Sequence, residues 1–235
     1  MSDSHYVGQE LDIFAHARNW KRYWSSHVRP HLSGDVLEVG AGIGANTPLL
    51  DPRSVHSWVS LEPDAELAQR AAAAFAGDPA TSGCQVIVGT LQTLRQDLRF
   101  DALLYIDVLE HIEQDKEELE RAAISLKTGG RLIVLSPAHQ WLYTEFDQSI
   151  GHVRRYDRAS LSACSPEGCT LSKLCYLDSV GMLASCANRL LLHQAMPDLR
   201  QILFWDRYLI PLSTFLDRLL FHRVGKSILA VWTKN

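Results

Sequence analysis

The fold is decided by the stretch Asp35-Val36-Leu37-Glu38-Val39-Gly40-Ala41-Gly42-Ile43-Gly44, in which a short apolar run ends in three closely spaced glycines. An apolar run bounded by glycines is typical of a buried strand that turns at once into the next element. Because glycine carries no side chain, a ligand at such a turn can lie against bare backbone. The stretch therefore predicts a strand followed by a ligand-binding turn.

Short strands and helices alternate on both sides of this stretch. We expect strands at 36–39, 58–62, 85–88, 100–106 and 131–136, and helices at 10–30, 64–76 and 115–126, with one more helix from Thr47 onward. Such alternation predicts a parallel sheet with helices on both faces. Ligands of these sheets bind where the strands end. Here the strand ends carry Glu38, Glu62, Gly89-Thr90 and Asp107.

The pattern changes after Pro137. Residues 139–157 are rich in aromatic, histidine and arginine side chains, strands are expected at 171–177 and 227–233, and 181–224 is expected to be an apolar helical insertion. This insertion should pack on the fold as helices or as a lid, with a homodimer face and a membrane-surface contact as the alternatives. The expected organisation is an N-terminal helical cap at 1–34 and one domain at 35–235, with substrate-side insertions at 138–165 and 181–225.

Composition narrows the class of protein. The 235 residues are 46% hydrophobic and carry a net charge of −4, which suits one globular domain and argues against nucleic-acid binding through a basic face. The five cysteines form no C-x-x-C pair, so we expect reduced thiols in a cytoplasmic protein. No uninterrupted apolar run reaches the length of about 18 residues typical of a transmembrane helix, so we expect no membrane span.

Two adenosine cofactors compete for the glycine turn. Gly40, Gly42 and Ala45 fit the looser G-x-G-x-x-A pattern of a dinucleotide site, with Glu62 placed for a ribose hydroxyl. S-adenosylmethionine (SAM) has the same adenosine end but no pyrophosphate, and its other end carries a cationic amine and a sulfonium. Glu38 would repel a pyrophosphate and attract those cations, which favours SAM. A nicotinamide-dependent reductase is disfavoured further because the sequence lacks a Tyr-x-x-x-Lys motif.

Four ordered motifs carry a family resemblance: 38–44 (EVGAGIG), 61–64 (LEPD), 107–112 (DVLEHI) and 126–134 (LKTGGRLIV). Together they resemble the class I SAM-dependent methyltransferases over about residues 19–137. The block from Pro137 to Tyr156 looks like a bacterial subgroup of these enzymes, many of which act on small molecules or glycoconjugates. The resemblance implies a Rossmann-like, mostly parallel sheet of seven strands with an antiparallel last strand.

The resemblance also implies cofactor contacts, position by position. The methionine part of SAM would be lined by Glu38, Gly40, Ala41 and Gly42, while Gly44 would allow close helix packing. Glu62 would hold the ribose hydroxyls, with Pro63 and Asp64 nearby; a solvated acid at the strand end is the alternative.

Three further contacts follow from the same resemblance. Thr90 and Leu91 would flank the adenine, although many relatives have an aspartate where this chain has Gly89-Thr90. Asp107 would face the methionine end, unless it caps the following turn. Tyr23 belongs, with Asn19 and Trp20, to a helix that closes over SAM in relatives.

The expected reaction is transfer of a methyl group to a small-molecule acceptor, primarily to a hydroxyl. Methyl transfer requires alignment and exclusion of water, and a hydroxyl must also lose its proton. His111 is the first candidate for the proton acceptor and His152 the second, and each could instead be structural. No metal is expected, because the acids are scattered over the strand ends. The alternatives are N- or C-methylation and a non-catalytic SAM-binding accessory protein.

Overall fold

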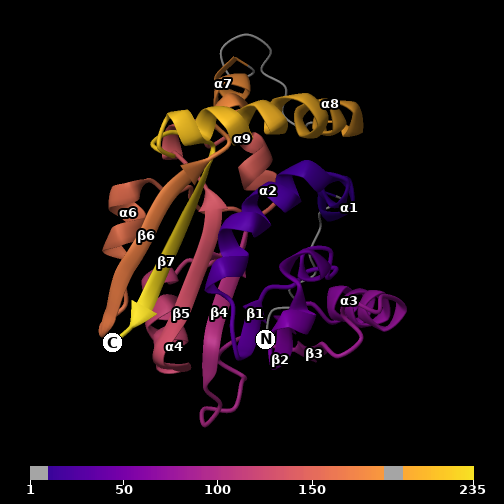
Figure 1. The fold of residues 1–235 in the computed structure, drawn as a ribbon, viewed down its shortest axis with the longest axis vertical. Helices are drawn as coiled ribbons and strands as arrows, with labels where there is room; N and C mark the ends of the chain where they lie inside the picture. The colour runs from indigo at the N-terminus through magenta and orange to yellow at the C-terminus, as the bar shows by residue number, and fades with distance from the viewer. Residues whose placement is uncertain (1–9, 188–197) are drawn as a thin grey trace.

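The computed structural model describes residues 10–187 and 198–235 and contains a seven-stranded sheet in the order β3-β2-β1-β4-β5-β7-β6 (Figure 1). The strands are β1 (Asp35–Val39), β2 (Ser57–Glu62), β3 (Gln85–Val88), β4 (Phe100–Ile106), β5 (Leu126–Pro137), β6 (Cys169–Leu177) and β7 (Ser227–Lys234). Neighbouring strands among β1 to β5 are parallel, and β7 is antiparallel to both β5 and β6. The expected Rossmann-like sheet with an antiparallel last strand is confirmed.

Each face of the sheet is covered by helices, because alternate strand residues point to opposite sides. On β4, Leu103 and Tyr105 join a buried cluster that includes Leu119 of α4 (Asp115–Ile124). Leu104 belongs to the opposite cluster, which includes Trp24 of α2 (Arg18–Val28). The helix α3 (Ala65–Gly77) is capped by Asp64, whose side chain accepts hydrogen bonds from the first-turn amides.

The expectation of a single N-terminal helix at 10–30 is wrong. The segment forms two helices, α1 (Glu10–Ala15) and α2, followed by the 3-10 turn η1 (Arg29–His31). The second helix is capped from far away in the sequence. The carboxylate of Asp206 accepts hydrogen bonds from the backbone N–H groups of Asn19 (3.1 Å) and Trp20 (2.8 Å). This tertiary cap satisfies two amides that a new helix start leaves without partners.

Two other elements differ from the expectations. The helix expected from Thr47 is only the 3-10 turn η2 (Thr47–Leu50), followed by η3 (Pro52–Ser54). The strand expected at 131–136 is the longer β5, whose register jumps from Leu126 opposite Phe100 to Arg131 opposite Ala102. Gly129 has φ +80° within this bulge, a conformation that glycine adopts without strain.

The C-terminal half adds short helices over the end of the sheet where β5 ends and β7 begins (Figure 1). The connection after β5 contains η5 (Gln140–Leu142), α5 (Glu145–Ser149) and α6 (Arg158–Ala163). The expected helical insertion contains α7 (Ser179–Ala187), α8 (Leu199–Phe204), the π-helical turn η7 (Trp205–Leu209) and α9 (Ile210–Leu219), while 188–197 lies outside the described residues. Among the described helices, none combines the length and the apolar character needed to cross a bilayer.

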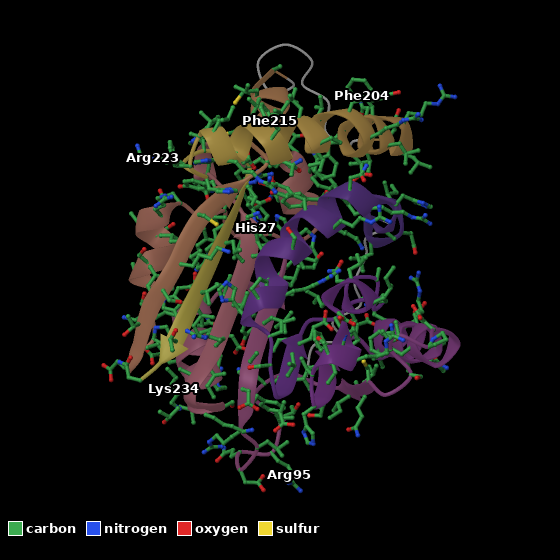
Figure 2. All side chains as sticks on the ribbon, viewed as in Figure 1. His27, Arg95, Phe204, Phe215, Arg223 and Lys234 are labelled. Atoms are coloured by element: carbon green, nitrogen blue, oxygen red, sulfur yellow. The ribbon has the colours of Figure 1, made fainter. Side chains whose placement is uncertain are left out.

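A buried polar network holds this helical layer to the sheet. Asp178, which follows β6, accepts hydrogen bonds from Trp205 Nε1 (2.8 Å) and Ser213 Oγ (2.6 Å). Asp217 of α9 accepts one from the hydroxyl of Tyr23 on α2 (2.7 Å). Several large apolar side chains of α8, η7 and α9 remain exposed, among them Phe204 and Phe215, which lie on the upper helical layer in Figure 2.

Candidate active site

The glycine turn after β1 is fixed to the end of β2 by its backbone. The N–H groups of Gly40 and Ala41 both donate to Leu61 O, at 2.8 and 3.0 Å. The backbone at Gly40, Gly42 and Gly44 has φ values of +72°, +56° and +74°, a region that other residues adopt only with strain. A Cβ at Gly40 would lie 2.5 Å from Val108 Cγ2, whereas one at Gly42 would meet no atom closer than 3.5 Å. The turn is therefore closely packed at Gly40 and open at Gly42.

Gly44 has the packing role expected for it. A Cβ at this position would lie 2.7 Å from Phe75 Cε1 and 3.2 Å from Ala71 Cα, both on α3. The absence of a side chain therefore lets α3 lie close to the turn.

Glu62, at the end of β2, joins the turn to the start of α3. Its Oε2 accepts a hydrogen bond from Gly42 N–H (2.7 Å), and its Oε1 accepts one from Asp64 N–H (3.0 Å). Burial raises the pKa of Glu62, and these two hydrogen bonds oppose the shift. An ionised carboxylate has about four lone-pair sites, so about two remain for hydroxyl donors of a ligand.

Glu38 is buried beneath the glycine turn. Its Oε2 accepts hydrogen bonds from Thr47 Oγ1 (2.7 Å), Ser60 Oγ (2.9 Å) and Trp58 Nε1 (3.1 Å). Burial raises the pKa of Glu38, opposed by the three hydrogen bonds and by the charge of Lys21. One carboxylate oxygen thus braces β1, β2 and the start of η2 together.

Lys21 is a site residue that the sequence reasoning missed. Its ammonium lies 3.4 Å from Ala45 O just beyond the glycine turn, and only 8% of the residue is exposed. Burial lowers the pKa of Lys21 to about 8, while Asp107 and Glu38 act in the opposite direction. A usable signal was the spacing of Lys21, Trp24 and Val28, which places the lysine on the buried stripe of α2.

Tyr23, expected at the cofactor, has its hydroxyl bonded to Asp217 on α9. It also lines a shallow surface hollow of about 390 Å³ with Asn19, Ile210 and Thr214, and the glycine turn does not line that hollow. The structure thus joins Tyr23 to the helical layer, and its contact with the cofactor stays a prediction.

The end of β3 lies beside Glu62, because Gly89 N–H donates to Glu62 O at 2.9 Å. Thr90 is exposed and its N–H donates to Thr93 Oγ1 (3.0 Å), whereas Leu91 is buried in the core. Pro63 is exposed in the turn before α3. The structure therefore brings Thr90 and Pro63 to the same rim as Glu62, and leaves Leu91 mainly as a packing residue.

Asp107 ends β4 in a left-handed conformation, with φ +54°. It does not cap the following 3-10 turn η4 (Leu109–His111), whose capping position is Val108. The residue is exposed, yet the protein around the carboxyl desolvates it and raises the pKa of Asp107 to about 6, opposed by the nearby His152, Lys21 and Lys226. Backbone strain in a non-glycine residue at a strand end is a common feature of functional sites.

The two candidate catalytic histidines lie together. The rings of His111 and His152 are 4.6 Å apart between centroids, nearly perpendicular to each other. The backbone brings them into contact, because Val153 N–H donates to Glu110 O (2.8 Å) and so holds the 139–157 loop against η4. Burial lowers the pKa of His111 to about 4, so this imidazole is neutral at neutral pH.

The other polar residues of the loop have structural partners. His139 Nε2 lies 3.1 Å from Gly225 O, and its ring stacks on Tyr176. Arg155 binds Asp147 through Nε and Nη2, at 2.8 and 2.9 Å. Arg154 instead forms an ion pair with Asp115.

Comparison with known proteins agrees with this geometry. Residues 37–134 match the family model described as a methyltransferase domain. No curated protein matches the chain. Among solved structures, a candidate methyltransferase from Bacillus halodurans C-125 is similar with a TM-score of 0.62 and 18% identity, covering 91% of this chain and 98% of that one.

Two other solved structures illustrate the range of the fold. An S-adenosylmethionine-dependent methyltransferase from Clostridium acetobutylicum ATCC 824 has a TM-score of 0.58 and 11% identity, with 93% of this chain and 92% of that one covered. The [4+2]-cyclase SpnF has a TM-score of 0.60 and 16% identity, with 97% and 95% covered. At these identities the likeness defines the fold alone, and one fold carries several chemistries.

The match over residues 37–134 thus indicates a methyltransferase domain, for which SAM is the implied cofactor. The residues present fit this cofactor. The glycine turn offers open backbone at Gly42, Glu62 retains acceptor capacity beside it, and charged groups of both signs, Lys21 and Asp107, lie at the other side of the turn.

Proposed function

We propose that this protein transfers a methyl group from SAM to a hydroxyl of a small-molecule acceptor. The observation that carries the proposal is the convergence, at the carboxyl ends of β1, β2 and β4, of the glycine turn, Glu62 and the His111–His152 pair. Bound SAM supplies an electrophilic methyl group, so the protein must position the acceptor, exclude water and accept or release one proton.

The residues of the turn have separate tasks in this proposal. Glu62 accepts hydrogen bonds from the ribose hydroxyls while its Gly42 contact keeps it in place. Asp107 and Glu38 favour the cationic amine, and the Lys21 ammonium favours the carboxylate of the methionine part. The two carboxylates would discriminate SAM from a dinucleotide, because they repel a pyrophosphate.

The acceptor side is formed by residues 138–165, 181–187 and 198–225 in this proposal. His152 donates from Nδ1 to Asp147 (2.9 Å), so a neutral His152 has its lone pair on Nε2. That atom is able to accept a proton or to bind a ligand. A homodimer through the exposed apolar side chains of α8 and α9 is the proposed assembly, which sedimentation velocity over a range of concentrations would test.

Calorimetric titration with S-adenosylhomocysteine tests the cofactor assignment. The wild type should bind it, and Glu62→Ala should weaken binding at least about tenfold, or 1.4 kcal/mol, because hydrogen bonds to a carboxylate are strong. Glu66→Ala, which removes an exposed acid from the first turn of α3, is the matched control and should bind as the wild type does. Tight binding of NADH with none of S-adenosylhomocysteine would refute the proposal.

A further inference from the structure

A buried carboxylate oxygen lacks a partner beside the two histidines. Glu110 is fully buried, and among the described residues its Oε1 has no hydrogen-bond partner. His152 Nε2 lies 3.8 Å from this oxygen, which is too far for a hydrogen bond. One ligand atom from each of Glu110, His111 and His152 lies within 4.8 Å of the others. An unsatisfied oxygen in the protein interior is costly unless something else binds it.

A second layer of contacts orients two of these three groups. Ser136 Oγ donates to Glu110 Oε2 (3.0 Å), which leaves Oε1 directed at the histidines. Asp147 fixes the His152 ring through Nδ1, and Arg155 holds Asp147 in turn. Although burial opposes it, the hydrogen bonds from His152 and Arg155 keep the pKa of Asp147 well below its usual value. A histidine held by a carboxylate through its other nitrogen is the usual arrangement of a metal ligand.

We propose that Glu110, His111 and His152 form a binding site for one divalent cation of the first transition row, such as Mn²⁺. Two imidazoles and one carboxylate are nitrogen and oxygen donors that suit these cations. This proposal departs from the sequence-based expectation that no metal binds. That expectation considered only the acids at the strand ends and did not consider the histidines.

The dimensions of the cluster allow such a cation. Three donors that each lie about 2.1 Å from one cation can all be at most about 3.6 Å from one another. The 3.8 Å between His152 Nε2 and Glu110 Oε1 is close to this limit. The separations of up to 4.8 Å in the cluster need a closure of about 1.2 Å, which rotation of the half-buried His111 side chain can supply. Asp107, near enough to act on both Glu110 and His152, adds a favourable negative charge.

The role of the cation rests on the proposed function, whereas its binding does not. The cation would lie beside Asp107 and the acceptor side of the domain. There it would hold the oxygen of an acceptor hydroxyl and make loss of its proton easier, the task for which a base was expected. This narrows the acceptor to a compound with a metal-binding hydroxyl.

Untagged, EDTA-treated protein titrated with Mn²⁺, and followed by the EPR signal of free Mn²⁺, tests the site. Mn²⁺ is chosen because the free cysteines would bind softer Zn²⁺. The wild type should bind one equivalent saturably. Glu110→Gln keeps the shape of the side chain, His111→Ala alters a half-buried position, and each should weaken binding at least tenfold. His56→Ala is the matched control, since His56 also faces a carboxylate, Asp35 at 2.7 Å, and should change nothing.

The outcomes separate the two proposals. Circular dichroism melts report whether each variant folds, and His111→Ala decides the matter if Glu110→Gln does not. Saturable binding lost in the variants supports the site. No saturable binding by the wild type, or equal binding by the wild type and by His111→Ala, overturns it, even where calorimetry still shows S-adenosylhomocysteine binding to the EDTA-treated protein. Failure of that cofactor binding would instead count against the methyltransferase proposal.

Discussion

Asp217 is expected to be one of the most sensitive positions for stability, although it lies far from the glycine turn in sequence. The side chain is fully buried. It accepts hydrogen bonds from the Tyr23 hydroxyl (2.7 Å), Asp178 N–H (2.7 Å) and Ser179 N–H (3.0 Å). Asp217→Ala leaves all three donors without a partner. Each buried backbone donor costs about 1.5 kcal/mol and the hydroxyl about 1 kcal/mol, so we expect a loss of about 4 kcal/mol.

Urea unfolding with linear extrapolation measures this loss. Tyr23→Phe removes only one of the three donors and should cost about 1 kcal/mol, because Asp217 keeps both backbone hydrogen bonds. Asp12→Ala is the matched control, since Asp12 is an exposed aspartate paired with Arg70, and it should stay within about 0.5 kcal/mol of the wild type. A loss below about 1.5 kcal/mol for Asp217→Ala, or one no larger than that for Tyr23→Phe, would refute the reasoning.

Two further predictions concern pH and the glycine turn. Burial lowers the pKa of His27 to about 4, below its unfolded value of about 6.5, so the unfolded chain binds the proton first and stability should fall as pH drops from about 6.5 to 4. His27→Gln should flatten this fall by up to about 1.4 kcal/mol per pH unit in urea unfolding at several pH values, and an unchanged slope would contradict the assignment. Gly40→Ala should cost about 2–4 kcal/mol, because a Cβ would approach Val108 to 2.5 Å at φ +72°. Gly83→Ala, where a Cβ meets nothing within 4 Å, should be nearly neutral in the same melts, and equal effects of the two substitutions would exclude the steric cause.

The first four strands, β1 to β4, could be predicted closely from the sequence. The expected bounds of β3 and β4 agree with the structure, and those of β1 and β2 differ by one residue. These strands are apolar runs with polar or glycine residues at both ends, so local pattern defines them. The errors fell where tertiary contacts decide, as at α2, whose start depends on the distant carboxylate of Asp206.

Most of the candidate cofactor site could also be proposed from the sequence. Gly40, Gly42 and Glu62 belong to motifs whose spacing follows from one strand–turn unit and the next strand. Lys21 was missed: its spacing with Trp24 and Val28 indicates a buried position, but no local pattern shows that it lies near the carboxylates of Asp107 and Glu38.

By itself, the sequence determined the sheet, the glycine turn and the class of cofactor, because each depends on residues close together in the chain. Only the tertiary structure brought His152 to Glu110 and His111, through the hydrogen bond from Val153 N–H to Glu110 O and the support of Asp147. Burial then left one oxygen of Glu110 without a partner among residues 10–187 and 198–235. Whether this oxygen has a hydrogen-bond partner depends on how the entire 139–157 loop packs, which no local pattern encodes.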